Sequence, residues 1–269
     1  MRKGKIRIGT SGWAYRDFIS TLYPPKVPAA EWLQYYASQL STVEILGTIH
    51  KHPKADALYK WYNTTPKDFV FSAVANKQIT HSLHLLNPRP ILIDLIKSFQ
   101  ILDGKMGPIV FQPPPRILSN FERFKKFAYS LQEASSSTPF VFEFLDPLWM
   151  TSEVKELLLK LKISTALSDA GGFQSTSNVS GDVSGNFVYI RLHGSPLAGE
   201  SGYSTAVLKT WAERILSWSN EGKDLFVYFG NTLRGQAIQD VSTLKSQIEL
   251  INTEIKREGP PRFFGENSL

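Results

Sequence analysis

Short apolar runs recur along the chain and are separated by segments of helical length. Several of these runs are hydrophobic almost without interruption, which is typical of strands that are covered on both faces in a parallel sheet. The pattern predicts eight strands, at residues 6–10, 42–46, 69–74, 108–112, 140–144, 164–169, 187–192 and 225–229.

The intervening segments carry apolar residues at three- and four-residue spacing, most clearly at 238–251, which predicts amphipathic helices. Ser204 has the position of an N-cap for a helix that ends near Gly222, where a glycine favours termination. Ser119 and Glu122 have the spacing of a capping box at the start of another helix.

Eight alternations of strand and helix predict a TIM-type (β/α)8 barrel in a single domain, residues 1–269, with a short C-terminal tail from about 257. A doubly wound open sheet is the alternative, but Gly9 and Gly12 after the first strand do not give the G-x-G-x-x-G spacing of a dinucleotide site. Residues 170–186 lack helical periodicity and are rich in Gly, Ser and Asn. We therefore expect a loop in place of most of the sixth helix.

Composition narrows the chemistry that is available. The chain has 269 residues, of which 42% are hydrophobic, and it has no cysteine, which excludes disulfides, cysteine nucleophiles and iron–sulfur clusters. The first residues contain no apolar stretch of the length of a signal peptide or a membrane span, so we expect a cytoplasmic protein without a membrane partner. The net charge of +6 favours anionic partners, although lysines and arginines scattered along predicted helices are also typical of solvated faces.

In barrels of this kind the active site is formed by the C-terminal ends of the strands and the loops that follow them. Polar and aromatic side chains gather at these positions. The candidate site residues are Ser11, Trp13, Tyr15, Glu44, His81, Gln112, Glu143, Trp149, Asp169, Arg191, His193 and Asn231.

Side chains alternate along a strand, so Arg191 and His193 share one face, and an inward orientation would bring them near Glu143 and Asp169. We assign Glu143, Asp169 and His193 to catalysis, with Glu143 or Asp169 as the base and His193 as the proton-transfer group. Arg191 is then a clamp for an anion or carboxylate. A satisfied ion-pair network that plugs the mouth of the barrel is the alternative interpretation.

Other features are less specific. His50 and His52, with the carboxylates above, suggest a divalent-metal site, but no H-E-x-x-H pattern is present, and we predict no metal and no cofactor. The glycine-rich segment 193–204 fits a phosphate-binding loop, a lid or a plain connection. Trp13, Tyr15 and Trp149 fit either stacking on a ligand or the apolar core.

The candidate residues lie in or near a set of short segments with a distinctive sequence. These segments are Ile-Gly-Thr-Ser-Gly-Trp-Ala-Tyr (8–15), Tyr23-Pro24, Thr-Val-Glu-Ile (42–45), Ile-Thr-His (79–81), Gln112 with Pro114, Phe-Glu-Phe (142–144), Trp149, Arg-Leu-His-Gly (191–194), Tyr203-Ser204 and Tyr-Phe-Gly-Asn (228–231). Through them the chain resembles the YecE-like family, also called domain of unknown function 72, from Ile6 to about Leu244. The resemblance implies a TIM-type barrel related in shape to the endonuclease IV and xylose isomerase-like barrels, with a polar cavity and no established reaction.

The chain departs from the family pattern at Leu46, Val74, Leu145 and Asp146, where the family usually has polar or basic residues. The resemblance therefore implies that the pocket of this chain carries less positive charge than is usual in the family. An anionic ligand of the family would bind this member more weakly, be replaced by another ligand, or no longer be turned over.

Three functions remain open at this point. The first is an enzyme that uses acid–base chemistry on a small polar or phosphorylated molecule, as Glu143, Asp169, Arg191 and His193 indicate. The second is a nucleic-acid-binding or processing protein, as the basic charge and the likeness to endonuclease IV-type barrels indicate. The third is a non-catalytic protein that binds a small polar or anionic ligand.

Overall fold

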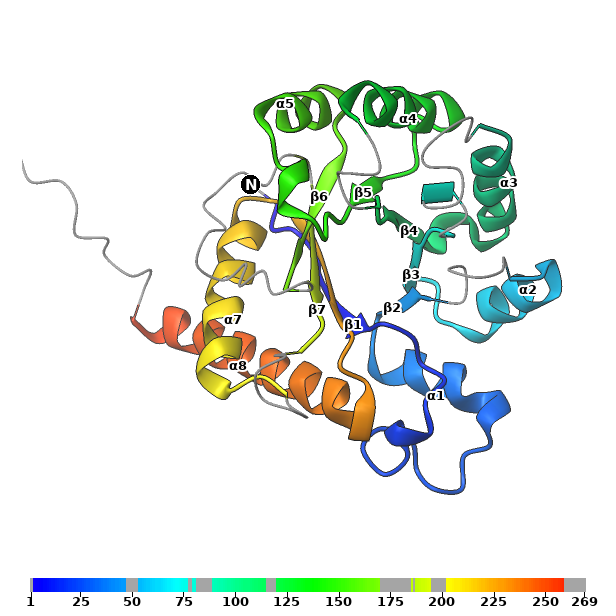
Figure 1. The fold of residues 1–269 in the computed structure, drawn as a ribbon. Coiled ribbons are helices and arrows are strands. Elements are labelled where there is room, and N and C mark those ends of the chain that lie inside the picture. The colour runs from blue at the N-terminus through cyan, green and yellow to red at the C-terminus, as the bar shows by residue number, and fades with distance from the viewer. Residues whose placement is uncertain are drawn as a thin grey trace, which may run out of the picture.

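A computed structural model of the chain describes residues 2–46, 53–76, 79–80, 89–114, 120–169, 185, 187–194 and 202–258. Its strands form a ring in which successive strands of the order β1-β8-β7-β6-β5-β4-β3-β2 are hydrogen bonded in parallel (Figure 1). The predicted TIM-type barrel is confirmed. The strands are β1 (Ile6–Thr10), β2 (Thr42–Ile45), β3 (Val70–Val74), β4 (Met106–Phe111), β5 (Phe140–Phe142), β6 (Ser164–Ser168), β7 (Phe187–Leu192) and β8 (Asp224–Phe229).

The ring closes where β1 meets β2. Directly after β1, Ser11 forms a parallel bridge with Glu44 of β2, and the Gly12 amide donates to the Glu44 carbonyl over 2.8 Å. Gly9 permits the close approach of the two strands, because a Cβ atom at this position would lie 2.1 Å from the Thr42 carbonyl oxygen. The first strand therefore has a steric requirement for glycine at its fourth residue.

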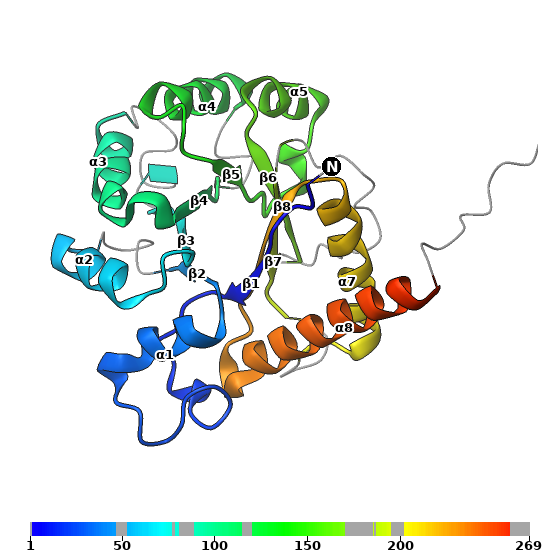
Figure 2. The same ribbon diagram turned by 180° about the vertical axis from the view of Figure 1, so that it is seen from behind.

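Helices surround the ring of strands on the outside, as both views show (Figures 1 and 2). Ser204 caps α7 as predicted, accepting a hydrogen bond from the Val207 amide at 3.3 Å. The N-cap of α4 is Asn120, which accepts from the Arg123 amide at 2.9 Å, while Ser119 lies outside the described residues. The helices are α1 (Trp32–Gln39), α2 (Ala55–Thr64), α3 (Arg89–Phe99), α4 (Phe121–Ala134), α5 (Ser152–Leu161), α7 (Thr205–Asn220) and α8 (Gln236–Glu258).

Two predictions about irregular segments fall mostly beyond the described residues. Of the predicted loop 170–186, only Gly185 is described. Helix α8 continues to Glu258, and residues 259–269 of the predicted tail are not described.

The apolar core has two parts. One fills the space between the strands and the helices, and the other fills the barrel interior with Val70, Val74, Val110, Val141, Tyr189, Phe226 and Tyr228. Two positions beyond Val141 and Tyr189, the same inward faces carry Glu143 and Arg191. The barrel interior therefore changes from apolar to charged toward the C-terminal ends of the strands. None of the described helices has the length and apolar character that a bilayer crossing requires.

Candidate functional site at the C-terminal ends of the strands

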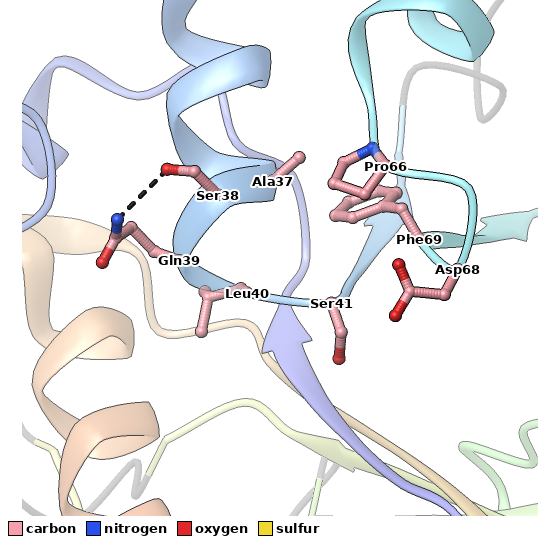
Figure 3. A pocket seen from close by; sticks show the side chains of 8 residues that line it. All are labelled: Ala37, Ser38, Gln39, Leu40, Ser41, Pro66, Asp68 and Phe69. Atoms are coloured by element: carbon pink, nitrogen blue, oxygen red, sulfur yellow. Dashed lines mark hydrogen bonds between the residues drawn. The ribbon is translucent and has the colours of Figure 1, made fainter.

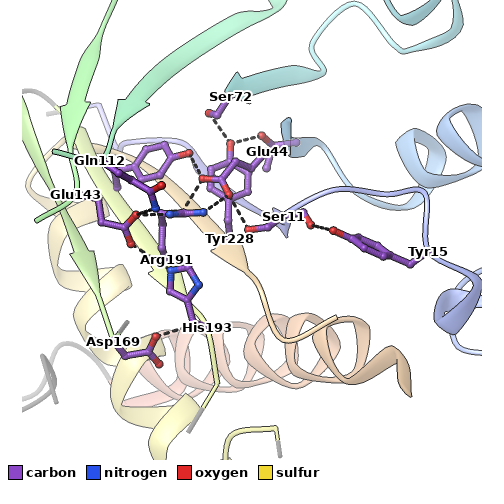
Figure 4. Close-up of polar contacts among 12 residues, drawn as sticks. Ser11, Tyr15, Glu44, Ser72, Gln112, Glu143, Asp169, Arg191, His193 and Tyr228 are labelled. Carbon is purple, nitrogen blue, oxygen red and sulfur yellow. Dashed lines mark hydrogen bonds and ion pairs between the residues drawn. The ribbon is translucent and has the colours of Figure 1, made fainter. Parts of the chain in front are cut away.

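A buried guanidinium lies between two carboxylates at the C-terminal end of the barrel (Figure 4). Arg191 faces Glu44 in a fork, with Nη2 2.9 Å from Oε2 and Nε 2.9 Å from Oε1. Its Nη1 atom donates to Glu143 Oε2. Both carboxylates are completely buried, and Arg191 is 3% exposed. Arg191 therefore clamps carboxylates of the protein itself.

The remaining lone pairs of these carboxylates are occupied by neutral donors. Ser11 donates to Glu44 Oε2 over 2.7 Å, and Tyr189 donates to Glu44 Oε1 over 2.8 Å. Gln112 donates to Glu143 Oε2 over 2.8 Å. Such saturation is what allows charges to be buried without a large penalty.

The electrostatic consequences follow from this packing. Burial alone raises the pKa of Glu143, but the Arg191 guanidinium and the hydrogen bond from His193 hold it well below its usual range. Burial likewise lowers the pKa of Arg191, but the charges of Glu44 and Glu143 more than reverse that effect and raise it. Glu143 is consequently an anion that accepts hydrogen bonds and has no proton to give.

Beneath the charged layer lies a layer of buried hydroxyl groups. The Tyr228 hydroxyl lies 2.6 Å from Thr42 Oγ1 and 2.8 Å from Ser72 Oγ (Figure 4). The Tyr36 hydroxyl accepts from the Thr10 amide at 2.9 Å and donates to the Thr42 carbonyl at 3.0 Å. Burial raises the pKa of both tyrosines, so these phenols remain neutral and link β1, β2, β3 and β8.

His193 belongs to the part of this cluster that is only partly buried. Its Nε2 atom lies 3.1 Å from Glu143 Oε1, and its side chain is 30% exposed whereas that of Glu143 is 0% exposed. Its backbone amide donates to Asp169 Oδ1 over 2.7 Å. The site thus presents a partly exposed imidazole whose ring contacts Glu143 and whose backbone is held by Asp169.

Asp169 lies beside this cluster and contacts Arg191 through the backbone, its amide donating to the Arg191 carbonyl at 3.4 Å, whereas its side chain bonds to other residues. The register pairs Ser168 with Arg191, so the inward position at the end of β6 belongs to Ser168 and the next side chain points to the other face. Asp169 instead accepts a hydrogen bond from the Tyr203 hydroxyl. The sequence-based expectation that Asp169 would meet Arg191 is corrected in this respect.

A second polar group ties the end of β8 to helix α8. The Asp240 carboxylate accepts a hydrogen bond from the side-chain amide of Asn231 at 2.7 Å and another from the backbone amide of Tyr203 at 3.2 Å. Burial raises the pKa of Asp240, and these hydrogen bonds oppose the rise. Asn231 is therefore anchored at the rim by the last helix.

The other candidate residues are distributed differently. The Tyr15 hydroxyl donates to the Ser11 carbonyl over 2.8 Å, which places it at the edge of the cluster. Trp13 packs edge-on against Trp61, with ring centroids 5.0 Å apart. Trp149 is fully buried in the core, 5.0 Å from the Phe124 ring, so it is separate from the polar cluster. His81 lies outside the described residues.

Sequence reasoning did not select Tyr189, Tyr203 or Asp240 for the site. Tyr189 precedes Arg191 by two positions, so strand alternation places it on the same inward face. Asp240 lies on the apolar face of the last helix. A carboxylate at such a position is unusual and could have marked Asp240 as a candidate site residue. For Tyr203 the available signal was its place in the Tyr203-Ser204 segment that matches the family.

Within the described residues, no group of three histidine, aspartate or glutamate side chains is arranged to hold a metal ion. His50 and His52, which suggested such a site, lie outside those residues.

A small open pocket of about 180 Å³ lies at the opposite end of the barrel (Figure 3). It is lined by the end of α1 and by residues that precede β2 and β3, including Ser38, Ser41 and Asp68. Because the Arg191 cluster lies at the other ends of the strands, this pocket does not contribute to it.

Comparison with known proteins agrees with this architecture. The chain matches the family model described as "Protein of unknown function DUF72" over residues 7–262. It is 23% identical to the UPF0759 protein YunF of Bacillus subtilis, over 95% of this chain and 98% of that protein.

Solved structures of similar proteins show the same fold. A DUF72 family protein from Thermotoga maritima has a TM-score of 0.77 and 21% identity, with 91% of this chain and 99% of that chain covered. A DUF72 family protein from Enterococcus faecalis has a TM-score of 0.73 and 18% identity, with 94% and 99% covered. The barrel described above, together with the family match along nearly its whole length, shows that this chain belongs to the DUF72 family.

Proposed function

We propose that this protein is an enzyme that transfers a proton to or from a small polar substrate, with His193 as the proton-transfer group. The observation that carries the proposal is the pairing of a partly exposed imidazole with a fully buried carboxylate, His193 Nε2 to Glu143 Oε1 at 3.1 Å. A base oriented by a second group is a recurrent feature of acid–base catalysis.

The neighbours of this pair support distinct roles. Glu143 is completely buried and its oxygens are already bonded, so it acts as a positioning residue for the imidazole. Arg191 keeps Glu143 ionised, and Asp169 fixes the backbone at His193. An imidazole held in this way loses little orientational freedom when it meets a substrate.

The same contacts favour a polar substrate over a phosphorylated one. Arg191 is directed at Glu44 and Glu143, so within the described part of the chain it does not offer its charge to an anion. A phosphate group would therefore meet carboxylates without the expected clamp.

The experiment incubates the protein with fractionated polar metabolites and follows their consumption by mass spectrometry. We expect at least one neutral polar compound to be consumed, at a rate that His193→Gln lowers by at least about 100-fold. Glu143→Gln should lower it as well and shift its pH profile. Glu122→Gln is the matched control, because Glu122 is exposed on α4 and forms a surface ion pair with Lys125 at 3.6 Å.

Consumption that survives His193→Gln contradicts the proposal. Binding of a metabolite without turnover contradicts it too, and favours the non-catalytic alternative. The nucleic-acid alternative rests on the net charge of +6 and stays a prediction. Its test is a mobility shift at low salt, which must weaken steeply as salt is added.

A further inference from the structure

The hydrogen on the His193 ring can be located from its surroundings. Nε2 faces Glu143 Oε1, and Glu143 also accepts from Arg191 and Gln112. A carboxylate that is ionised in this way accepts hydrogen bonds only, so Nε2 must carry the hydrogen. In the neutral imidazole, the lone pair is then on Nδ1.

The Nδ1 atom faces a position where the chain has no side chain. Gly230 follows β8 directly, and its amide donates to the Leu192 carbonyl over 2.7 Å. A Cβ atom at Gly230 would lie 3.1 Å from His193 Nδ1 and 3.7 Å from its Cα. Any larger residue would crowd the lone pair. Within the described residues, no hydrogen-bond donor reaches Nδ1.

The next residue carries a second acceptor. Asn231 Nδ2 donates to Asp240 Oδ2 over 2.7 Å, and this fixes the amide orientation because a carboxylate cannot donate. Asn231 Oδ1 is buried and has no hydrogen-bond partner among the described residues. A buried acceptor without a donor is unfavourable, so this atom calls for a donor from outside the described chain segments.

We propose that the rim formed by the ends of β7 and β8 binds a small neutral or cationic molecule through its hydroxyl or amino groups, one donating to His193 Nδ1 and another to Asn231 Oδ1. The inference rests on the proposed function, because the group bonded to Nδ1 is the one whose proton is transferred. It adds the class of substrate and the side from which it approaches. An anionic ligand does not fit, because its oxygen atoms are hydrogen-bond acceptors and would face His193 Nδ1 and Asn231 Oδ1, which are acceptors too.

The test uses the full chain labelled with ¹⁵N-histidine, whose ring nitrogens report both the tautomer and any donor at Nδ1. The chain has five histidines, and the His193→Gln variant identifies the signals of His193 by their loss. The probes are xylitol and glucose for hydroxyl groups, putrescine for amino groups, and inorganic phosphate for anions. Polyols also stabilise proteins non-specifically at high concentration, so the readout is a saturable shift of the His193 Nδ1 signal.

We expect the Nε2–H tautomer, and a saturable Nδ1 shift with a hydroxyl or amino probe. Gly230→Ala should raise the apparent dissociation constant by at least about tenfold. Gly104→Ala is the matched control, because a Cβ atom there meets nothing within 4 Å, and it should bind as the wild type does.

The Nδ1–H tautomer, a response to phosphate alone, or no response to any probe overturns the inference. Failure of the proposed function is distinguishable. Probe binding without turnover contradicts the enzyme but leaves this site intact, whereas His193-dependent turnover of an anionic compound supports the enzyme and contradicts this substrate class.

Discussion

The Ser11 hydroxyl donates to Glu44 Oε2 over 2.7 Å, and this bond joins the first and second strands at the level where the barrel interior becomes charged. Glu44 thereby serves two purposes. It closes the barrel between β1 and β2, and it neutralises one side of Arg191.

Replacing Glu44 with glutamine should therefore destabilise the fold strongly. The change leaves Arg191 with one carboxylate in a fully buried setting, and removal of one partner from a buried ion pair costs about 3–5 kcal/mol. The free energy of unfolding is measured by urea denaturation. Glu122→Gln, which changes an exposed pair, should cost less than about 1 kcal/mol, and equal effects of the two variants would refute the argument.

Acid should weaken the fold through Glu143. The pKa of Glu143 in the folded protein lies below that of an unfolded glutamate, because Arg191 and His193 outweigh the effect of burial. The stabilisation is therefore present above about pH 4 and declines as the pH falls below it. Urea denaturation at a series of pH values should show wild type losing stability more steeply than Glu143→Gln, and parallel pH curves would contradict this.

Alkaline titration should distinguish buried from accessible phenols. The pKa values of Tyr15, Tyr23, Tyr36, Tyr189, Tyr203 and Tyr228 are raised, chiefly by burial. Their contribution to stability is full below about pH 10, where unfolded tyrosines begin to ionise, and is lost as the pH rises further.

The measurement is phenolate absorbance at pH ~11, in native and in denatured protein. The native signal should fall short of that of the denatured chain, which carries ten tyrosines. If both samples reached the same absorbance while circular dichroism showed an intact fold, the phenols would not be protected.

Gly9→Ala should damage the closure of the barrel. The new methyl group would start 2.1 Å from the Thr42 carbonyl oxygen, so β1 and β2 must separate, at a cost of about 3 kcal/mol. Thermal unfolding of Gly9→Ala and of the unhindered control Gly104→Ala checks this, and similar melting temperatures in the two variants would be inconsistent with a tight seam.

Much of the fold was accessible from the sequence because the apolar runs are short, frequent and separated by helical periodicity. Strand ends were less certain. The fourth strand begins at Met106, two residues before the predicted start at 108, because Gly107 interrupts the apolar run without interrupting the strand. The alternation of side chains along β6 also explains why Asp169 was expected to face Arg191 but does not. Its polar neighbour Ser168 has the inward position instead.

The sequence indicated which residues form the site but not which of them contact one another. Alternation places Glu143 and Arg191 on inward faces, yet only the register of the closed ring brings Glu44 of β2 within 2.9 Å of Arg191 of β7. Trp149 shows the converse. Its position after β5 suggested ligand contact, but packing against Phe124 buries it under α4.

The bonds from Asp240 to Asn231 and Tyr203 have a consequence for how the protein is made. A ribosome adds residues from the N-terminus onward, so all eight strands are synthesised before the helix that carries Asp240. A nascent chain that ends after β8 contains every residue of the Arg191 cluster, but it lacks the Asp240 carboxylate that holds Asn231 and Tyr203. Competence to hold a ligand should therefore arise late, when the closing helix docks.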